Sequence, residues 1–157
     1  MSVAEAVAAV DDRQRFRLGD HPMWKHVKFD APADVYISDM ARVRGRLASI
    51  EVGRYASLAD FVVLTADAPL RIGHNVKIGP SAILCSHAPL RICANAKIGA
   101  HAQVLTGGYD DEGAFWRGPV EVGTGAIIGP GAVILPGVTI KAGAYVPPNA
   151  VVGRNAA

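Results

Sequence analysis

Aliphatic residues recur every six positions along most of this chain. Six is not a multiple of 3.6, so an α-helix would spread these residues around its circumference, whereas a short strand and a turn, repeated, would keep them on one side. The pattern therefore predicts one short strand in each hexad, with a buried aliphatic residue in each strand. The predicted interior residues are Val52, Leu58, Leu64, Ile72, Ile78, Leu84, Ile92, Ile98, Val104, Val122, Ile128, Ile134, Ile140, Val146 and Val152.

A longer repeat is superimposed on the hexads. Residues 64–83 (LTADAPLRIGHNVKIGPSAI) and 84–103 (LCSHAPLRICANAKIGAHAQ) are identical at eleven of twenty positions. Three hexads with a two-residue extension make twenty residues, which is the length of one triangular turn of a parallel β-helix. Successive turns stack at the strand spacing of about 4.8 Å, so we expect Arg71 to lie beside Arg91. The predicted fold class is all-β, a parallel β-helix of hexapeptide repeats.

The chain divides into an N-terminal arm and the repeat domain. Residues 2–16 are expected to form a short helix, because Ser2 and Glu5 match a capping box and the following apolar residues share one helical face. The remainder of residues 1–33 is rich in glycine and proline and is expected to be irregular. The β-helix domain is expected to span residues 34–157.

Composition narrows the class of protein. The chain has 157 residues, of which 50% are hydrophobic, and a net charge of +2. That charge is too small to indicate nucleic-acid binding. No apolar run approaches the roughly 20 residues of a membrane span, and the N-terminus has no basic-then-apolar signal. Cys85 and Cys93 fall on different faces of neighbouring coils, so we expect free thiols in a cytoplasmic protein without nucleic-acid or membrane partners.

The hexad pattern is interrupted at residues 106–119, TGGYDDEGAFWRGP. A β-helix tolerates a loop at a corner, since only the strands are fixed by pairing. Loops displayed on rigid scaffolds often carry binding or catalytic residues, so Asp111, Phe115 and Trp116 are candidates for substrate binding. The alternative is a loop that only packs against a neighbouring molecule.

Three segments carry a resemblance to a known family. They are PVEVGTGAIIGPGAVILPGVTIKAGAYVPPNAVVGR at residues 119–154, the arrangement TGGYDD…F…PVEVG, and the opening ADVYISDMARV. The chain resembles the hexapeptide-repeat acyltransferases of the left-handed β-helix superfamily, especially the sugar and exopolysaccharide O-acetyltransferases. This resemblance implies left-handed winding and a homotrimer with sites between subunits. It also implies transfer of an acyl group, usually acetyl, from acyl-CoA to a hydroxyl or amine of a sugar or similar small acceptor.

The same resemblance implies a histidine base at the position of Tyr109. Tyrosine is a poor base near neutral pH because its ordinary pKa is about 10, but its hydroxyl could orient an acceptor or donate to an oxyanion. His87 is the candidate replacement, because the hexad frame puts it one coil below Gly107, beside the loop. Asp110 or Asp111 could orient His87. The alternative is a non-catalytic trimeric scaffold or binding protein that has lost the catalytic histidine.

Donor binding is also implied only by the resemblance. Pro130, Pro148 and Arg154 match positions that line the CoA arm in the family. Arg154 keeps a positive charge suited to the CoA phosphates, whereas the two prolines lack backbone N–H donors.

A metal enzyme of the γ-carbonic-anhydrase type is a further alternative, because those enzymes share the fold and bind zinc through three histidines. Here His74, His87 and His101 fall at different offsets within their hexads. We therefore expect no metal.

Overall fold

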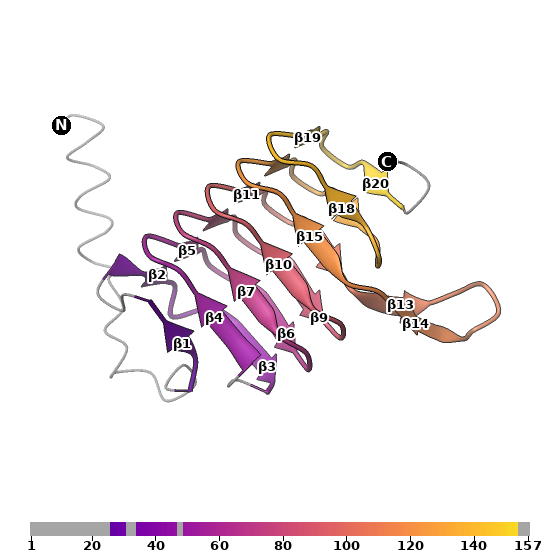
Figure 1. Cartoon of the computed structure of the whole chain (residues 1–157), viewed down its shortest axis with the longest axis horizontal. Coiled ribbons are helices and arrows are strands. Elements are labelled where there is room, and N and C mark those ends of the chain that lie inside the picture. Colours follow the sequence, from indigo (N-terminus) through magenta and orange to yellow (C-terminus); the bar gives the residue numbers. More distant parts are fainter. Residues whose placement is uncertain (1–25, 31–33, 47–48, 154–157) are drawn as a thin grey trace.

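The computed structural model describes residues 26–30, 34–46 and 49–153. In this part of the chain, three six-stranded parallel sheets wind into a stack of triangular coils (Figure 1). Each coil contributes one short strand to each sheet. The predicted all-β architecture of stacked coils is confirmed, and it is consistent with left-handed winding. The helix expected over residues 2–16 lies outside the described residues.

We name the three sheets A, B and C. Sheet A contains β1 (Lys28–Phe29), β4 (Ile50–Val52), β7 (Leu70–Ile72), β10 (Leu90–Ile92), β15 (Val120–Val122) and β18 (Thr139–Ile140). Sheet B contains β2 (Tyr36–Ile37), β5 (Ser57–Leu58), β8 (Lys77–Ile78), β11 (Lys97–Ile98), β16 (Ile127–Ile128) and β19 (Tyr145–Val146). Sheet C contains β3 (Arg42–Gly45), β6 (Val63–Ala66), β9 (Ile83–Ser86), β12 (Gln103–Leu105), β17 (Val133–Ile134) and β20 (Val151–Val152).

The predicted interior column is the core of the molecule. Leu64, Leu84 and Val104 are paired in register on neighbouring strands, and each is fully buried. The other predicted aliphatic positions are buried in the same way, except for Val152 on the last strand, which is half-buried. Stacking equivalent aliphatic residues removes their side chains from water, while each strand pairs with its neighbours in the adjacent coils.

The first described coil begins earlier than the sequence indicated. β1 pairs in parallel with β4, so sheet A extends upstream of residue 34, where the β-helix was expected to start. The twenty-residue repeat stacks as predicted, with Arg71 opposite Arg91. At the next corner, Nδ2 of Asn75 donates to Oδ1 of Asn95 at 2.9 Å.

Residues 106–119, expected as a loop, form a hairpin that projects from the corner between sheets C and A (Figure 1). Its strands, β13 (Gly107–Tyr109) and β14 (Phe115–Arg117), pair in antiparallel fashion with Tyr109 opposite Phe115. Asp110 closes the turn, because its Oδ1 accepts hydrogen bonds from the backbone N–H groups of Glu112 and Ala114 at 3.0 and 2.9 Å.

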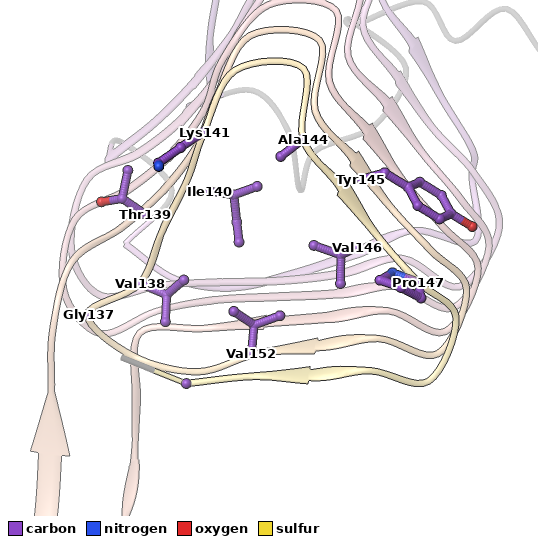
Figure 2. A pocket seen from close by; sticks show the side chains of 11 residues that line it. Gly137, Val138, Thr139, Ile140, Lys141, Ala144, Tyr145, Val146, Pro147 and Val152 are labelled. Atoms are coloured by element: carbon purple, nitrogen blue, oxygen red, sulfur yellow. The ribbon is translucent and has the colours of Figure 1, made fainter. Parts of the chain in front are cut away.

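The described coils end in an open triangle (Figure 2). Val138, Ile140, Val146 and Val152 point into its interior, whereas Tyr145 points outward. They line part of a cavity of about 540 Å³. This cavity continues the apolar core, so we assign it to the end of the β-helix and not to the candidate site below.

Candidate functional site

A histidine and a carboxylate are in contact at the corner from which the hairpin projects. Nδ1 of His87 lies 3.1 Å from Oδ2 of Asp67, and the His87 side chain is 31% exposed. Both residues directly follow strands of sheet C, β9 and β6, which pair in register. A carboxylate only accepts hydrogen bonds, so in a neutral His87 ring this contact places the proton on Nδ1 and leaves a lone pair on Nε2.

The backbone of His87 is fixed by a buried hydroxyl. Oγ1 of Thr106 accepts hydrogen bonds from the backbone N–H groups of His87 and Ala88, at 2.7 and 3.0 Å. The same hydroxyl donates to the carbonyl of Cys85 at 2.7 Å. Thr106 is fully buried, and it immediately precedes β13. One side chain therefore ties the base of the hairpin to the strand end that carries His87.

The hairpin packs directly on the histidine. The ring of Phe115 meets the His87 ring edge to face, with ring centres 5.5 Å apart. Gly107 permits this approach, since a Cβ there would lie 2.7 Å from Cζ of Phe115 and 3.1 Å from two atoms of His87. The predicted position of His87, one coil below Gly107 and beside residues 106–119, is confirmed.

The outer part of the hairpin presents aromatic surface. Tyr109 is 76% exposed, and its ring lies 5.3 Å from that of Phe115, which is itself 44% exposed. The guanidinium of Arg117 lies 5.9 Å from the centre of the Phe115 ring. A Cβ at Gly108 would meet nothing within 4 Å, so open space adjoins this strand. Such a surface can stack against an apolar face of a small molecule.

The carboxylate that contacts His87 is neither of the two expected, Asp110 and Asp111. Asp110 binds backbone groups of its own turn, and Asp111 is exposed on the hairpin, whereas Asp67 contacts His87. The sequence did contain a signal, because Asp67 occupies in residues 64–83 the place that His87 occupies in residues 84–103. Coil stacking superposes those two places. Trp116, the other candidate on the hairpin, is half-buried opposite Gly108.

Both cysteines in the described residues are free thiols, as predicted. Burial, followed by the nearby charge of Asp67, raises the pKa of the Cys85 thiol. Burial, followed by the charge of Glu121, raises the pKa of Cys93. Neither thiol is therefore activated as a nucleophile at neutral pH.

The residues expected to line the donor lie at another corner. Pro130 and Pro148 follow β16 and β19 on successive coils, between sheets B and C, where the backbone N–H of Asn149 donates to the Pro130 carbonyl at 3.0 Å. Sheet C separates this corner from His87. Arg154 lies outside the described residues. Within one chain, His87 and these two prolines are thus not brought together.

The described residues contain neither a cluster suited to a metal ion nor a helix suited to crossing a membrane. Across residues 26–30, 34–46 and 49–153, no three His, Cys, Asp or Glu side chains cluster closely enough to hold a metal ion. His74 instead accepts a hydrogen bond at Nδ1 from the backbone N–H of Arg54. In the same residues, no helix has the length and apolar character needed to cross a membrane.

Residues 119–154 match the family model described as bacterial transferase hexapeptide (six repeats). The last coils of this chain are therefore similar to the hexapeptide repeat of bacterial transferases. The match begins where the hairpin returns to the coils at β15 and runs through β20. No curated protein sequence matches the chain closely enough to count as a relative.

Solved structures resemble the chain over most of its length. A variant of AntD, an N-acyltransferase from Bacillus cereus, in complex with dTDP-4-amino-4,6-dideoxyglucose and coenzyme A, has a TM-score of 0.73 at 19% identity, covering 97% of this chain and 79% of that chain. A variant of perosamine N-acetyltransferase from Caulobacter crescentus, in complex with CoA and GDP-perosamine, has a TM-score of 0.53 at 24% identity, covering 82% of this chain and 49% of that chain. At these identities the likeness establishes the fold.

Proposed function

We propose that this protein transfers an acyl group from acyl-CoA to an amine or hydroxyl of a sugar, with His87 as the general base. The observation that carries the proposal is the His87–Asp67 contact beneath an aromatic hairpin, on a scaffold of transferase-type hexapeptide coils. The solved structures with this fold support the chemistry, because they include N-acyltransferases in complex with CoA and nucleotide-linked sugars.

In the proposed reaction, His87 takes a proton from the acceptor. The acceptor O–H or N–H donates to Nε2 as its oxygen or nitrogen attacks the thioester carbonyl. The carbon–sulfur bond then breaks, and the imidazolium returns the proton to the departing CoA thiolate, so His87 ends the cycle neutral. Asp67 supports this role by holding the proton on Nδ1 and by stabilising the transient positive charge.

The hairpin supplies the proposed acceptor surface. Phe115 contacts the His87 ring, Tyr109 contacts Phe115, and both exposed rings suit the apolar face of a sugar. We propose that the Tyr109 hydroxyl orients the acceptor or donates to the oxyanion, as the sequence predicts. Asp110 contributes indirectly, by fixing the turn that carries Tyr109, while Asp111 and Trp116 remain candidates for further acceptor contacts.

Donor binding is proposed at Pro130, Pro148 and Arg154, as the family resemblance implies. Since the two prolines lie at a different corner from His87, a complete site needs a second copy of the chain. This requirement supports the expected homotrimer with sites between subunits. The two free thiols are compatible with the expected cytoplasmic location, and the proposed chemistry needs no resident metal.

The acyl group is proposed to be acetyl, and an amine acceptor is favoured over a hydroxyl. Perosamine N-acetyltransferase is named for acetyl transfer to an amine, while another AntD structure, with a TM-score of 0.52 at 18% identity, covering 96% of this chain and 80% of that chain, contains 3-hydroxybutyryl-CoA. Both donors therefore belong in the first test.

The test is release of the CoA thiol. Purified protein would be supplied with acetyl-CoA or 3-hydroxybutyryl-CoA and with dTDP-4-amino-4,6-dideoxyglucose, GDP-perosamine or simple sugars. We expect acceptor-dependent turnover that falls at least about 100-fold in His87→Gln, as for loss of a general base. His74→Gln, which changes a histidine at a different corner, should keep the wild-type rate.

Two results would decide against the enzyme. Absence of turnover with every pair, together with no binding of CoA by calorimetry, would favour the non-catalytic scaffold. Turnover that is unaffected in His87→Gln would retain the transferase but remove His87 as its base.

A further inference from the structure

Arg117, at the end of β14, is a cation beside the proposed base that the acyl-transfer scheme does not use. It lies opposite Gly107 in the hairpin, and a Cβ at Gly107 would be 3.1 Å from two atoms of His87. The backbone N–H of Gly118, the next residue, donates to the carbonyl of Thr106 at 2.9 Å, and the Thr106 hydroxyl holds the backbone of His87. The returning strand of the hairpin therefore places Arg117 at the corner that carries the histidine.

The Arg117 side chain is on the face of the hairpin that packs on His87. Alternate residues of a strand point to the same face, so Arg117 and Phe115 share one face of β14. The centre of the Phe115 ring lies 5.5 Å from that of the His87 ring and 5.9 Å from the guanidinium carbon of Arg117. The guanidinium and the imidazole thus cannot be farther apart than these two distances together, a gap that a pyranose ring carrying one phosphate can bridge.

Arg117 has no acidic partner among the residues that the structure describes. None of the ion pairs found in residues 26–30, 34–46 and 49–153 includes it. At the same corner Asp67 contacts His87, and at the hairpin tip one carboxylate oxygen of Asp110 binds two backbone N–H groups. Arg117 is exposed, so its guanidinium can bind an anion from solution through two parallel N–H donors, the geometry that phosphate favours.

Arg91 adds a second uncompensated charge on the same coil as His87, four residues further along the chain. It is exposed and lies in register with Arg71 on the neighbouring strand. Arg71 is paired with Glu51 through Nε at 3.6 Å, whereas no carboxylate of the described coils lies within ion-pairing distance of Arg91. Like charges opposite each other on neighbouring strands are destabilising, and a bound anion would offset that repulsion.

We propose that Arg117 binds a phosphate group of the acceptor while the acceptor's amine or hydroxyl meets His87. Arg91 provides a second positive charge, which suits a doubly charged phosphate or a diphosphate better than a single carboxylate. This inference rests on the proposed function, because it takes the corner at His87 as the acceptor site. It adds a requirement that the acyl-transfer scheme lacks: the acceptor is a phosphate ester, either a sugar phosphate or a nucleotide-linked sugar.

Binding to the wild-type chain tests the proposal without turnover. Calorimetry would compare three forms of 4-amino-4,6-dideoxyglucose: the methyl glycoside, the 1-phosphate and the dTDP-linked sugar. We expect a phosphate-bearing form to bind at least about tenfold more tightly than the methyl glycoside, as for a charge-assisted contact. Preference for the 1-phosphate identifies a sugar phosphate as the acceptor, whereas preference for the dTDP-linked form identifies a nucleotide-linked sugar. Equal affinity of all three forms, or no binding of any, would overturn the proposal.

Substitution of Arg117 by Gln should remove that preference. The side chain is exposed, so the variant should keep the wild-type fold, which circular dichroism would check. Arg117→Lys keeps the charge without the paired donors and should recover part of the preference. Lys141→Gln removes one positive charge just after β18, on the last coil, and should bind all three forms like the wild type. A preference that survives in Arg117→Gln, or that Lys141→Gln loses equally, would contradict a phosphate site at Arg117.

Kinetics separate this inference from the proposed function. In Arg117→Gln, kcat/KM for the phosphate-bearing acceptor should fall at least about tenfold through KM, while the methyl glycoside reacts at the wild-type rate. An equal loss with both acceptors would show that Arg117 supports the site without recognising phosphate, and the proposal would fall. If no acceptor is acylated while the binding preference still depends on Arg117, acyl transfer fails and the phosphate site stands. If the wild type acylates all three forms equally well, the transferase stands and the phosphate site falls.

Discussion

The carboxylate of Asp67 lies 3.1 Å from Nδ1 of His87, one coil away along sheet C. This relationship follows from the twenty-residue repeat, since both residues occupy the same place in successive blocks. The repeat thus does more than build the scaffold. At one place where the two blocks differ, Asp67 in the first block and His87 in the second put a carboxylate next to an imidazole beside the hairpin.

Replacing Asp67 by Asn should impair the proposed catalysis without unfolding the protein. The amide can still contact Nδ1, but it no longer favours the proton there or stabilises the imidazolium. We expect kcat/KM to fall roughly tenfold or more. In ¹⁵N-edited spectra of the wild-type protein without ligands, His87 should show the Nδ1–H tautomer, and this preference should weaken in the variant.

The matched control is Asp111→Asn, which removes an exposed carboxylate that does not contact His87. It should leave the tautomer of His87 unchanged. If Asp111→Asn alters the tautomer while Asp67→Asn does not, the hairpin acid orients the histidine in solution and Asp67 does not.

The reactivity of Cys85 offers a readout that is independent of turnover. Burial is the larger cause of its raised pKa, and the charge of Asp67 adds to it. Neutralising Asp67 therefore lowers the pKa of Cys85, so a larger fraction is thiolate at pH 8. We expect faster alkylation of Cys85 by iodoacetamide in Asp67→Asn than in the wild type, measured peptide by peptide.

Cys93 serves as the internal reference in that experiment. Its pKa is raised by burial and by Glu121, without a contribution from Asp67. Its alkylation rate should be the same in both proteins. Equal acceleration of both cysteines would indicate a general loosening of the fold instead of a local charge effect.

Adjacent glycines in β13 should respond differently to substitution. Gly107→Ala introduces a Cβ that would overlap Phe115 and crowd His87, so the hairpin must shift away from the histidine. Gly108→Ala meets only open space. We expect Gly107→Ala to melt at a lower temperature and to lose activity, while Gly108→Ala keeps the wild-type melting temperature. Equal thermal stability of the two variants would show that the hairpin does not pack on His87 as described.

The buried hydroxyl of Thr106 should contribute more to the free energy of unfolding than its size indicates. Thr106→Val keeps the shape but leaves the backbone N–H groups of His87 and Ala88 without their acceptor. Buried groups that lose a partner in this way cost about 1–3 kcal/mol, so the free energy of unfolding should fall by that amount in urea titrations. Thr106→Ser should recover most of the loss. Thr139→Val, at an exposed position on sheet A, should change stability little.

The fold could be predicted from the sequence because every coil of a β-helix is stabilised in the same way, by buried aliphatic residues and by strand pairing between coils. Each hexad places an aliphatic residue such as Leu84 inside, so the period of these residues alone predicts the architecture. The hairpin was predicted only as an excursion, because residues 106–119 have no alternation that would reveal the pairing of Tyr109 with Phe115. The level of His87 could be predicted because coil stacking is regular.

The orienting acid was missed for a different reason. The loop was expected beside His87, which made Asp110 and Asp111 the candidates, whereas the carboxylate that contacts His87 is that of Asp67, one coil away. In the structure, Asp110 instead closes the hairpin turn, because its Oδ1 accepts hydrogen bonds from two backbone N–H groups. Contacts between coils, twenty residues apart, decided the arrangement, and the same offset joins Asn75 to Asn95.

The repeat of Arg71 over Arg91 and Asn75 over Asn95 gives this molecule a modular length. Excising one complete block, residues 64–83, would bring residue 63 next to residue 84 with each sheet still in step, because every strand would find an equivalent neighbour. Insertion of an additional block would be equally well accommodated. Evolution could therefore shorten or lengthen the β-helix by whole coils while leaving its C-terminal end and the projecting hairpin intact.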